Sequence, residues 1–151
     1  MATTLQALLT DPAATGLYRL ASRKRTAVLR AEIERAGLRC AVLDGTAIAD
    51  KASFLRACAD ALAFPAYFGH NWDAFEECLT DLSWLSPAPA GGVILLYTQA
   101  APFIRRAPAD WATARAILEA AVAHWRGTAT PLSVLLRGTA ALVPDLPELC
   151  A

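Results

Sequence analysis

The sequence predicts a single α/β domain in which a three-stranded parallel sheet is packed with helices. Three segments rich in branched apolar residues, 39–44, 93–97 and 132–136, have the composition of strands. Segments with helical periodicity separate each strand from the next, and strands joined by such crossovers pair in parallel. Residues 93–97 read Val-Ile-Leu-Leu-Tyr without a polar interruption, which is typical of a strand covered on both faces.

The composition supports a compact domain. Of the 151 residues, 56% are hydrophobic and 19% are charged, a balance that favours a packed core over disorder. The N-terminus has no basic stretch followed by a continuous apolar run, and no apolar run approaches the ~20 residues of a membrane span. We therefore expect a cytoplasmic protein with no membrane partner.

Four cysteines, Cys40, Cys58, Cys78 and Cys150, lack the C-x-x-C spacing of zinc sites. Cys40 begins a predicted strand, and Cys58 and Cys78 lie on the apolar faces of predicted helices. We expect four free thiols in a reducing compartment that act as small apolar side chains, with no metal and no cofactor.

We divide the chain into an N-terminal helical extension at 1–38, a central domain at 39–137 and an irregular C-terminal tail at 138–151. The tail contains two prolines and no regular periodicity, so no strand or helix is expected there.

The extension is expected to hold two helical pieces. A short amphipathic piece is followed by a turn at Asp11-Pro12 and by a linker through Gly16. A helix then runs from about residue 23 to 36, with basic residues that we interpret as a solvated face because Glu32 and Glu34 interrupt them. Its apolar stripe is predicted to consist of Val28, Leu29, Ile33 and Ala36.

Two helices of the central domain have recognisable ends. Asp50 is predicted as the N-cap of a helix at 51–63. Pro108 is predicted as the first residue of a helix at 108–126, with Gly127 as its stop. The core face of this second helix is predicted to be Trp111, Ala114, Leu118, Ala121, Val122 and Trp125.

Between these helices, an aromatic loop leads into an acidic helix that is expected to run to about Leu82. The segment reads Phe64-Pro65-Ala66-Tyr67-Phe68-Gly69-His70-Asn71-Trp72-Asp73-Ala74. Asn71 is predicted as the N-cap. At 100° per residue, one face consists of Phe75, Cys78, Leu79 and Leu82. The other consists of Asp73, Glu76, Glu77 and Thr80. One face can therefore pack on a core while the other presents negative charge.

The charges are distributed unevenly along the chain. The 14 Lys and Arg balance the 14 Asp and Glu, so the net charge gives no reason to expect a direct nucleic-acid partner. Residues 57–104 nevertheless contain five acids and no base, a local balance of −5. These acids are Asp60, Asp73, Glu76, Glu77 and Asp81. For an acidic helix of this kind, the alternative interpretation is a solvated face without a partner.

The aromatic residues fall into two groups. Core-like spacing is seen for Trp72, Phe75, Trp84, Trp111 and Trp125, and all of these except Trp72 are predicted to lie in the core. Tyr67 and Phe68 lie in the loop beside the acidic face, and loop aromatics in that position are typical interface anchors, although one of the two can turn inward. His70 is interpreted as a polar loop residue, since a His70–Asp73 acid–base pair would lack a nucleophile or metal.

Signatures of catalysis are missing from the sequence. It contains no G-x-S-x-G elbow, no H-E-x-x-H, no Walker loop and no G-x-G-x-x-G. Glu76 and Glu77 are adjacent on the helix and diverge by 100°, so they do not form a facing carboxylate pair. We therefore expect that the protein is not an enzyme.

Two motifs resemble the barstar family of intracellular ribonuclease inhibitors. The segment Pro65-Ala66-Tyr67-Phe68-Gly69-His70-Asn71-Trp72-Asp73-Ala74 follows the family's pattern Pro-x-Tyr-aromatic-Gly-x-Asn-x-Asp-Ala. The segment Ala41-Val42-Leu43-Asp44-Gly45 is similar to the family's first strand and turn. The resemblance covers roughly residues 39–137 and implies a barstar-like fold for that part of the chain.

The resemblance also implies a set of partner-binding residues. They are Tyr67, Phe68, Gly69, Asn71, Asp73, Glu76 and Glu77. Tyr67 is similar to the family's loop tyrosine and Asp73 to its first helical aspartate, while Glu77 takes the place of the central aspartate that enters the enzyme's phosphate site. Glu76 stands where the family has a tryptophan, so a charge replaces an aromatic anchor.

Two functions from different classes follow. The first is a protein inhibitor, monomeric when free, that sets its acidic helix into the basic active site of a small ribonuclease or similar toxin in an immunity or antitoxin role. Its carboxylates would take the place of phosphate charges there. The second is a small α/β enzyme or ligand-binding domain of unknown chemistry.

Overall fold

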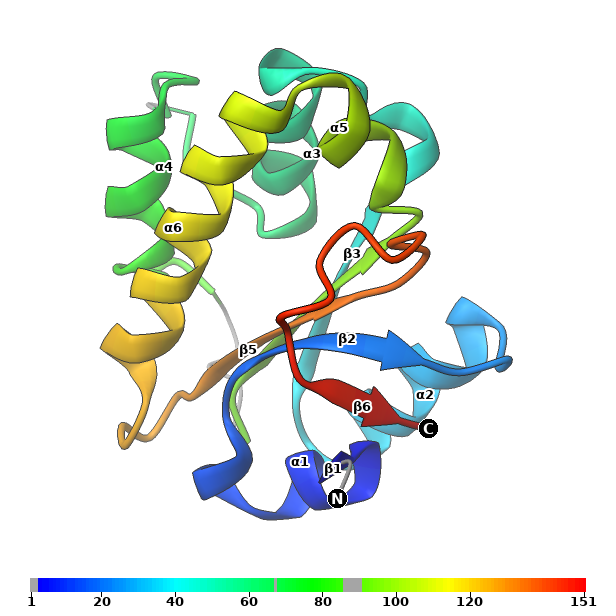
Figure 1. Cartoon of the computed structure of the whole chain (residues 1–151). Coiled ribbons are helices and arrows are strands. Elements are labelled where there is room, and N and C mark those ends of the chain that lie inside the picture. Colours follow the sequence, from blue (N-terminus) through cyan, green and yellow to red (C-terminus); the bar gives the residue numbers. More distant parts are fainter. Residues whose placement is uncertain (1–2, 67, 86–90) are drawn as a thin grey trace.

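The computed structural model describes residues 3–66, 68–85 and 91–151, and its centre is a six-stranded sheet. The strands are β1 (Thr3–Thr4), β2 (Leu17–Ala21), β3 (Arg39–Asp44), β4 (Val93–Thr98), β5 (Leu132–Leu136) and β6 (Glu148–Cys150). They lie in the order β1-β6-β2-β5-β4-β3, and every neighbouring pair is parallel (Figure 1). The parallel pairing predicted for the three central-domain strands is confirmed.

The predicted number of strands is wrong, because six strands form the sheet rather than three. β2 lies just after the segment that we interpreted as a linker, and β6 lies in the tail that was expected to be irregular. Both strands are short, and β6 has only three residues, so neither carries a readable two-residue alternation. They exist because β2 pairs with β5 and β6 pairs with β2, across more than a hundred residues of sequence.

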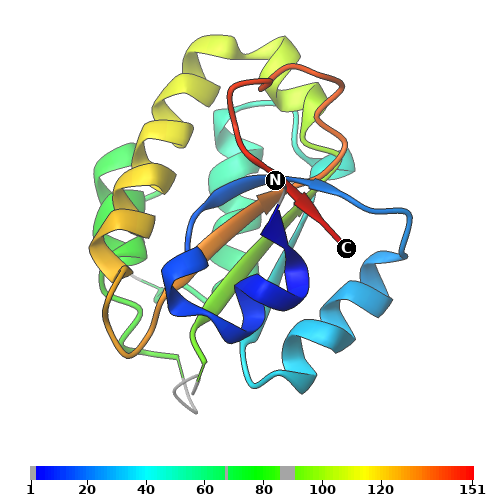
Figure 2. The same cartoon turned by 60° about the horizontal axis from the view of Figure 1, so that its bottom comes forward.

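Helices cover both faces of the sheet, so the fold has three layers: helices, strands and helices. On one face lie α1 (Leu5–Thr10) and α2 (Thr26–Arg35). On the other lie α3 (Lys51–Ala61), α4 (Trp72–Leu79), α5 (Ala101–Arg106) and α6 (Pro108–Trp125). Figures 1 and 2 show the two groups on opposite sides of the strands. The short 3₁₀ turns are Pro12–Ala14 and Gly45–Ala47.

β4 shows how one strand serves two cores. Val93, Leu95 and Tyr97 belong to the larger apolar cluster, which they share with α3 to α6. Ile94 and Leu96 belong to the smaller cluster beneath α1 and α2. This alternation is the two-residue period of a strand, and it explains why the uninterrupted apolar run was a correct signal for a strand buried on both faces.

The predicted helix ends are mostly confirmed. The side chain of Asp50 accepts a hydrogen bond from the backbone N–H of Ser53, and the Ser53 hydroxyl completes a capping box at the start of α3. Pro108 is the first residue of α6, as expected. The sequence analysis did not predict α5, a helix of six residues between β4 and α6.

The predicted apolar stripe of α2 is partly wrong. Leu29 and Ile33 are fully buried, but Val28 is 45% exposed and Ala36 is exposed beyond the end of the helix. Leu29 and Ile33 are four residues apart and lie one above the other, whereas Val28 is rotated by 100° toward solvent. The helix also begins at Thr26 rather than near residue 23.

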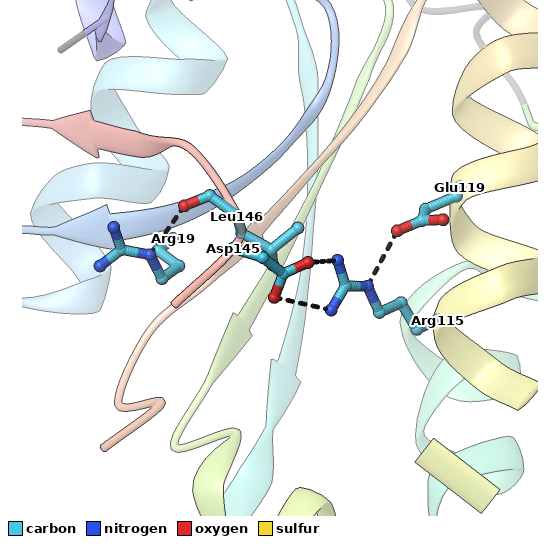
Figure 3. A network of polar contacts seen from close by, with 5 residues as sticks. All are labelled: Arg19, Arg115, Glu119, Asp145 and Leu146. Carbon is cyan, nitrogen blue, oxygen red and sulfur yellow. Dashed lines mark hydrogen bonds and ion pairs between the residues drawn. The ribbon is translucent and has the colours of Figure 1, made fainter. Parts of the chain in front are cut away.

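A polar network ties the C-terminal segment to the rest of the fold (Figure 3). Arg115 of α6 donates to both carboxylate oxygens of Asp145, and its Nε donates to Glu119 at 2.8 Å. The next residue, Leu146, accepts a 2.9 Å hydrogen bond from Arg19 Nε of β2. Residues from both ends of the chain are thereby held on one sheet, and the proposed boundaries at 38 and 137 stay a prediction.

Candidate protein-binding site

Asn71 sets the start of the acidic helix α4. Its side-chain oxygen accepts a 2.8 Å hydrogen bond from the backbone N–H of Ala74, and its carbonyl accepts one from Phe75 at 3.0 Å. Asn71 itself has extended backbone angles, as an N-cap residue should. The predicted cap is confirmed, and it fixes which residues of α4 face outward.

The two faces of α4 are those that the sequence predicts, although the helix ends at Leu79 rather than near Leu82. Phe75, Cys78 and Leu79 are buried, and Leu82 just beyond the helix is buried too. The carboxylate residues of the opposite face are all exposed, namely Asp73, Glu76 and Glu77. Within the described part of the chain, none of these carboxylates forms an ion pair or accepts a side-chain hydrogen bond. Their negative charge is therefore available to a partner.

Two tryptophans hold the acidic helix and its neighbouring segment in place. Trp125 at the end of α6 donates its indole N–H to the carbonyl of Leu79, at 2.7 Å. This bond satisfies a carbonyl in the last turn of α4, which has no partner within the helix. Trp84 donates to the carbonyl of Leu62 at 3.0 Å and joins the segment after α4 to the end of α3. Both rings are half-buried against the larger core, so α4 is held firmly before any partner arrives.

The loop before α4 turns Phe68 inward. Phe68 is 6% exposed, and its ring centroid lies 5.0 Å from that of Phe64 and 4.7 Å from that of His70. Phe68 therefore packs beneath the loop, on its core side, and holds the loop in place. Gly69 and His70 are exposed, and His70 has a φ of +53°. Tyr67, the other loop aromatic of the predicted site, lies outside the described residues.

Trp72 occupies a position between core and surface. It is half-buried against the larger core, with ring centroids 6.1 Å from Phe54 and 6.0 Å from Phe75. The ammonium of Lys51 lies 5.4 Å from the centre of its ring. Trp72 thus joins the first turn of α4 to the first turn of α3, and it borders the acidic face.

A small hollow lies beside Glu77. It has a volume of about 140 Å³ and is lined by Phe68, Ala74, Glu77, Cys78 and Asp81. Glu77 belongs to α4 and Asp81 to the turn just after the helix, and both carboxylate residues line the hollow. Asp81 was not among the predicted site residues, although its spacing from Glu77 was a usable signal. The hollow is large enough for part of one cationic side chain, which both carboxylates could neutralise.

The described ranges contain no cluster of potential metal ligands. No group of three or more His, Cys, Asp or Glu side chains there is close enough to hold a metal ion. All four cysteines carry free thiols, and burial raises the pKa of Cys40 to about 11 and that of Cys58 as well, which makes them poor nucleophiles. None of the described helices has the length and apolar character needed to cross a membrane.

Fold and site together define a class of protein. It is an α/β domain with a capped acidic helix on its surface, and the carboxylates of that helix form no ion pairs with the described residues. A family model described as barstar, barnase inhibitor, matches residues 38–137, which are 100 of the 151 residues. The chain therefore belongs to the barstar family, as the two motifs implied. The match spans β3 to β5 with α3 to α6, and β1, β2, α1, α2 and β6 lie outside it. No curated protein matches the chain.

Proposed function

We propose that this protein is an intracellular inhibitor that binds the basic active site of a small ribonuclease, or of a toxin with a similar site, through the outer face of α4. The observation that carries the proposal is the exposure of Asp73, Glu76 and Glu77 on a capped helix, without ion pairs among the described residues. Membership of a family described as barnase inhibitors supports the same partner class.

The chemistry of such a partner explains why carboxylates suit this surface. An enzyme that cleaves RNA holds phosphates with Arg, Lys or His, so its empty active site is positively charged. Asp73 and Glu77 would make charge-assisted hydrogen bonds with those groups. Because a protein–protein complex of this kind is steered by charge, association should slow as salt is raised. Glu76, which replaces the family's tryptophan, adds charge to the surface, so we expect a partner whose rim is more basic than apolar.

The test begins by capturing the partner. The wild-type protein and an Asp73→Ala/Glu77→Ala variant are immobilised side by side and exposed to cytoplasmic and secreted fractions of the source cell. The proteins retained by the wild type alone are then assayed for ribonuclease activity with and without added inhibitor. Genes next to this one provide a second list of candidate small secreted ribonucleases.

Once a partner is in hand, Glu77→Ala should weaken the complex by about 30- to several-thousand-fold, mainly through a faster off-rate. This range corresponds to the ~2–5 kcal/mol typical of leaving a buried partner charge unpaired. Asp60→Ala is the matched control, because Asp60 is an exposed acid of α3 in the same base-free segment. Affinity that is unchanged by both Glu77→Ala and Asp73→Ala would exclude the acidic-helix mechanism.

A further inference from the structure

A second candidate site lies where the connections of the sheet diverge. β2 and β5 are neighbours, but the chain leaves β2 for α2 on one face and leaves β5 for the segment held against α6 on the other. Figure 1 shows these two departures at the same end of the sheet. In parallel α/β sheets, the crevice outside the carboxyl ends of two such strands is the usual place for a small ligand.

An open pocket lies at this position. It has a volume of about 400 Å³, which is within the range of small-molecule sites. Its lining comes from three segments at or just beyond the carboxyl ends of β2, β4 and β5. It consists of Arg23, Lys24, Arg25, Thr26, Thr98, Gln99, Arg137 and Gly138. Four of these eight residues are basic and none is acidic. A polar ligand with several negative charges fits this lining better than an apolar or cationic one.

Arg137 builds the crevice rather than merely lining it. Its guanidinium donates to the carbonyl oxygens of Ser22 at 3.0 Å and Lys24 at 2.6 Å, and to Thr26 Oγ1 at 3.5 Å. These bonds hold the segment after β2 against the end of β5. They use three of the five N–H donors of the guanidinium and leave two for a ligand.

The other cations differ in how far they are already neutralised. Lys24 Nζ lies 2.8 Å from Glu32 Oε1, so part of its charge is satisfied within the protein. Arg23 and Arg25 are exposed and form no ion pair within the described ranges. They therefore supply the free positive charge of the crevice.

The charges here work against the stability of the fold. Three bases stand directly before α2, Arg25 at the N-cap makes no capping hydrogen bond, and the first turn contains no acid. Cations at this position are repelled by the positive end of the helix dipole. An anion in the crevice would remove the repulsion and accept bonds from the first backbone N–H groups of α2.

From the cavity, its basic lining and its place in the sheet, we propose that this crevice binds a small ligand carrying a phosphate monoester. The phosphate is held by Arg23, Arg25 and the free donors of Arg137, while Gln99 offers its amide to the rest of the molecule. Residues 23–26 lie outside the family match, and α2 lies across the sheet from α4 (Figure 2). The site is therefore separate from the acidic helix and goes beyond the proposed inhibitory function.

The test measures binding of inorganic phosphate and of a nucleoside monophosphate to the full chain by calorimetry and by thermal shift, with sodium chloride at matched ionic strength as the reference. An Arg23→Gln/Arg25→Gln variant changes only exposed side chains and should fold normally. Arg35→Gln is the matched control, because Arg35 is an exposed base in the last turn of the same helix.

We expect saturable binding with a raised melting temperature for the wild type and for Arg35→Gln. Each lost charge-assisted contact should weaken the affinity by about tenfold or more, so the double variant should lose most of the binding. Phosphate compounds that act no differently from chloride would overturn the proposal. Equal weakening by Arg35→Gln would overturn it too, as would binding confined to RNA oligonucleotides.

Discussion

The two halves of the sheet are held together in different ways. In the half that matches the family, strands of five or six residues pair along their whole length, and six residues of β3 are in register with six of β4. In the other half, β1 and β6 have two and three residues. Single side chains support that half: Arg19 binds the carbonyl of Leu146, and Arg126 binds that of Thr15. Backbone pairing between long strands therefore stabilises the first half, and contacts between residues far apart in the sequence stabilise the second.

The halves also differ in charge, which the net value of zero conceals. The family half presents the acidic face of α4, whereas three of the four bases that line the crevice, Arg23, Lys24 and Arg25, lie outside the family match. An acidic helix face and a separate basic crevice fit two unrelated ligands better than one. The contrast shows that the strands and helices added outside the family match contribute a surface of their own as well as structure.

The largest effect should come from deleting residues 1–37, which removes β1, β2, α1 and α2. This deletion exposes one edge of β5 and leaves β6 without its partners. Among the described residues it also removes seven buried apolar side chains, each worth about 1.5–3 kcal/mol on burial. They are Leu5, Leu8, Leu17, Tyr18, Leu20, Leu29 and Ile33. Their sum rivals the whole stability of a typical domain. We expect circular dichroism to show no cooperative melting of the truncated chain. A truncated chain with a melting temperature near that of the full-length protein would show that the family half does not depend on the other half for its stability.

A smaller effect is expected from single substitutions within α2. Leu29→Ala should lower the free energy of unfolding by about 2–5 kcal/mol, because Leu29 is fully buried and its removal leaves a cavity. Val28→Ala, one position earlier, should change it by less than about 0.5 kcal/mol, because Val28 is 45% exposed. Urea denaturation of both variants measures the difference. Similar losses for the two would mean that α2 packs differently from this arrangement.

The contrast between the halves also explains what the sequence could predict. β3, β4 and β5, the caps at Asp50 and Asn71, and the faces of α4 depend on residues close together in sequence. Local patterns therefore sufficed. β2 and β6 depend on partners far away along the chain, and their few residues carry no periodicity of their own. No local rule could identify them as strands.

The orientation of the candidate-site residues could be predicted only where it depends on local helix geometry. The outward direction of Asp73, Glu76 and Glu77 follows from helical geometry once Asn71 caps the helix. The inward direction of Phe68 depends instead on Phe64, which packs against it only in the folded loop. The basic crevice joins segments that follow three different strands. Only the order of the strands brings them together.

The ion pair that holds the C-terminal segment should have a modest, pH-dependent effect. Hydrogen bonds from Arg115 hold the pKa of the exposed Asp145 carboxyl below its ordinary value of 3.8. A carboxyl whose pKa is lower in the folded state stabilises the protein above its unfolded pKa and loses this contribution as pH falls through the folded pKa. Asp145→Asn should therefore lower the melting temperature by a few degrees at pH 7.

The same reasoning predicts that the difference in melting temperature between wild type and Asp145→Asn begins to shrink near pH 3.8, the ordinary pKa of the carboxyl, and disappears only below the lower folded-state pKa, where folded Asp145 becomes protonated. Asp60→Asn, an exposed acid in no ion pair of the described residues, is the control and should change little at any pH. A deficit of Asp145→Asn that stays constant from pH 7 to pH 3 would show that the effect does not come from the charge.

The smallest effects concern two buried tyrosines, one in each half. In the family half, the hydroxyl of Tyr97 is buried without a hydrogen-bond partner among the described residues, and burial raises its pKa. In the other half, the hydroxyl of Tyr18 donates to the carbonyl of Ala14 at 2.5 Å. Removing an unsatisfied buried hydroxyl relieves its desolvation cost, whereas removing one that is hydrogen-bonded loses about 0.5–1.5 kcal/mol. Tyr97→Phe should therefore leave the melting temperature unchanged or raise it, and Tyr18→Phe should lower it, as measured by calorimetry under identical conditions. If Tyr97→Phe destabilised the protein as much as Tyr18→Phe does, the Tyr97 hydroxyl would have a hydrogen-bond partner, such as a buried water. The larger core would then contain a polar group among its apolar side chains.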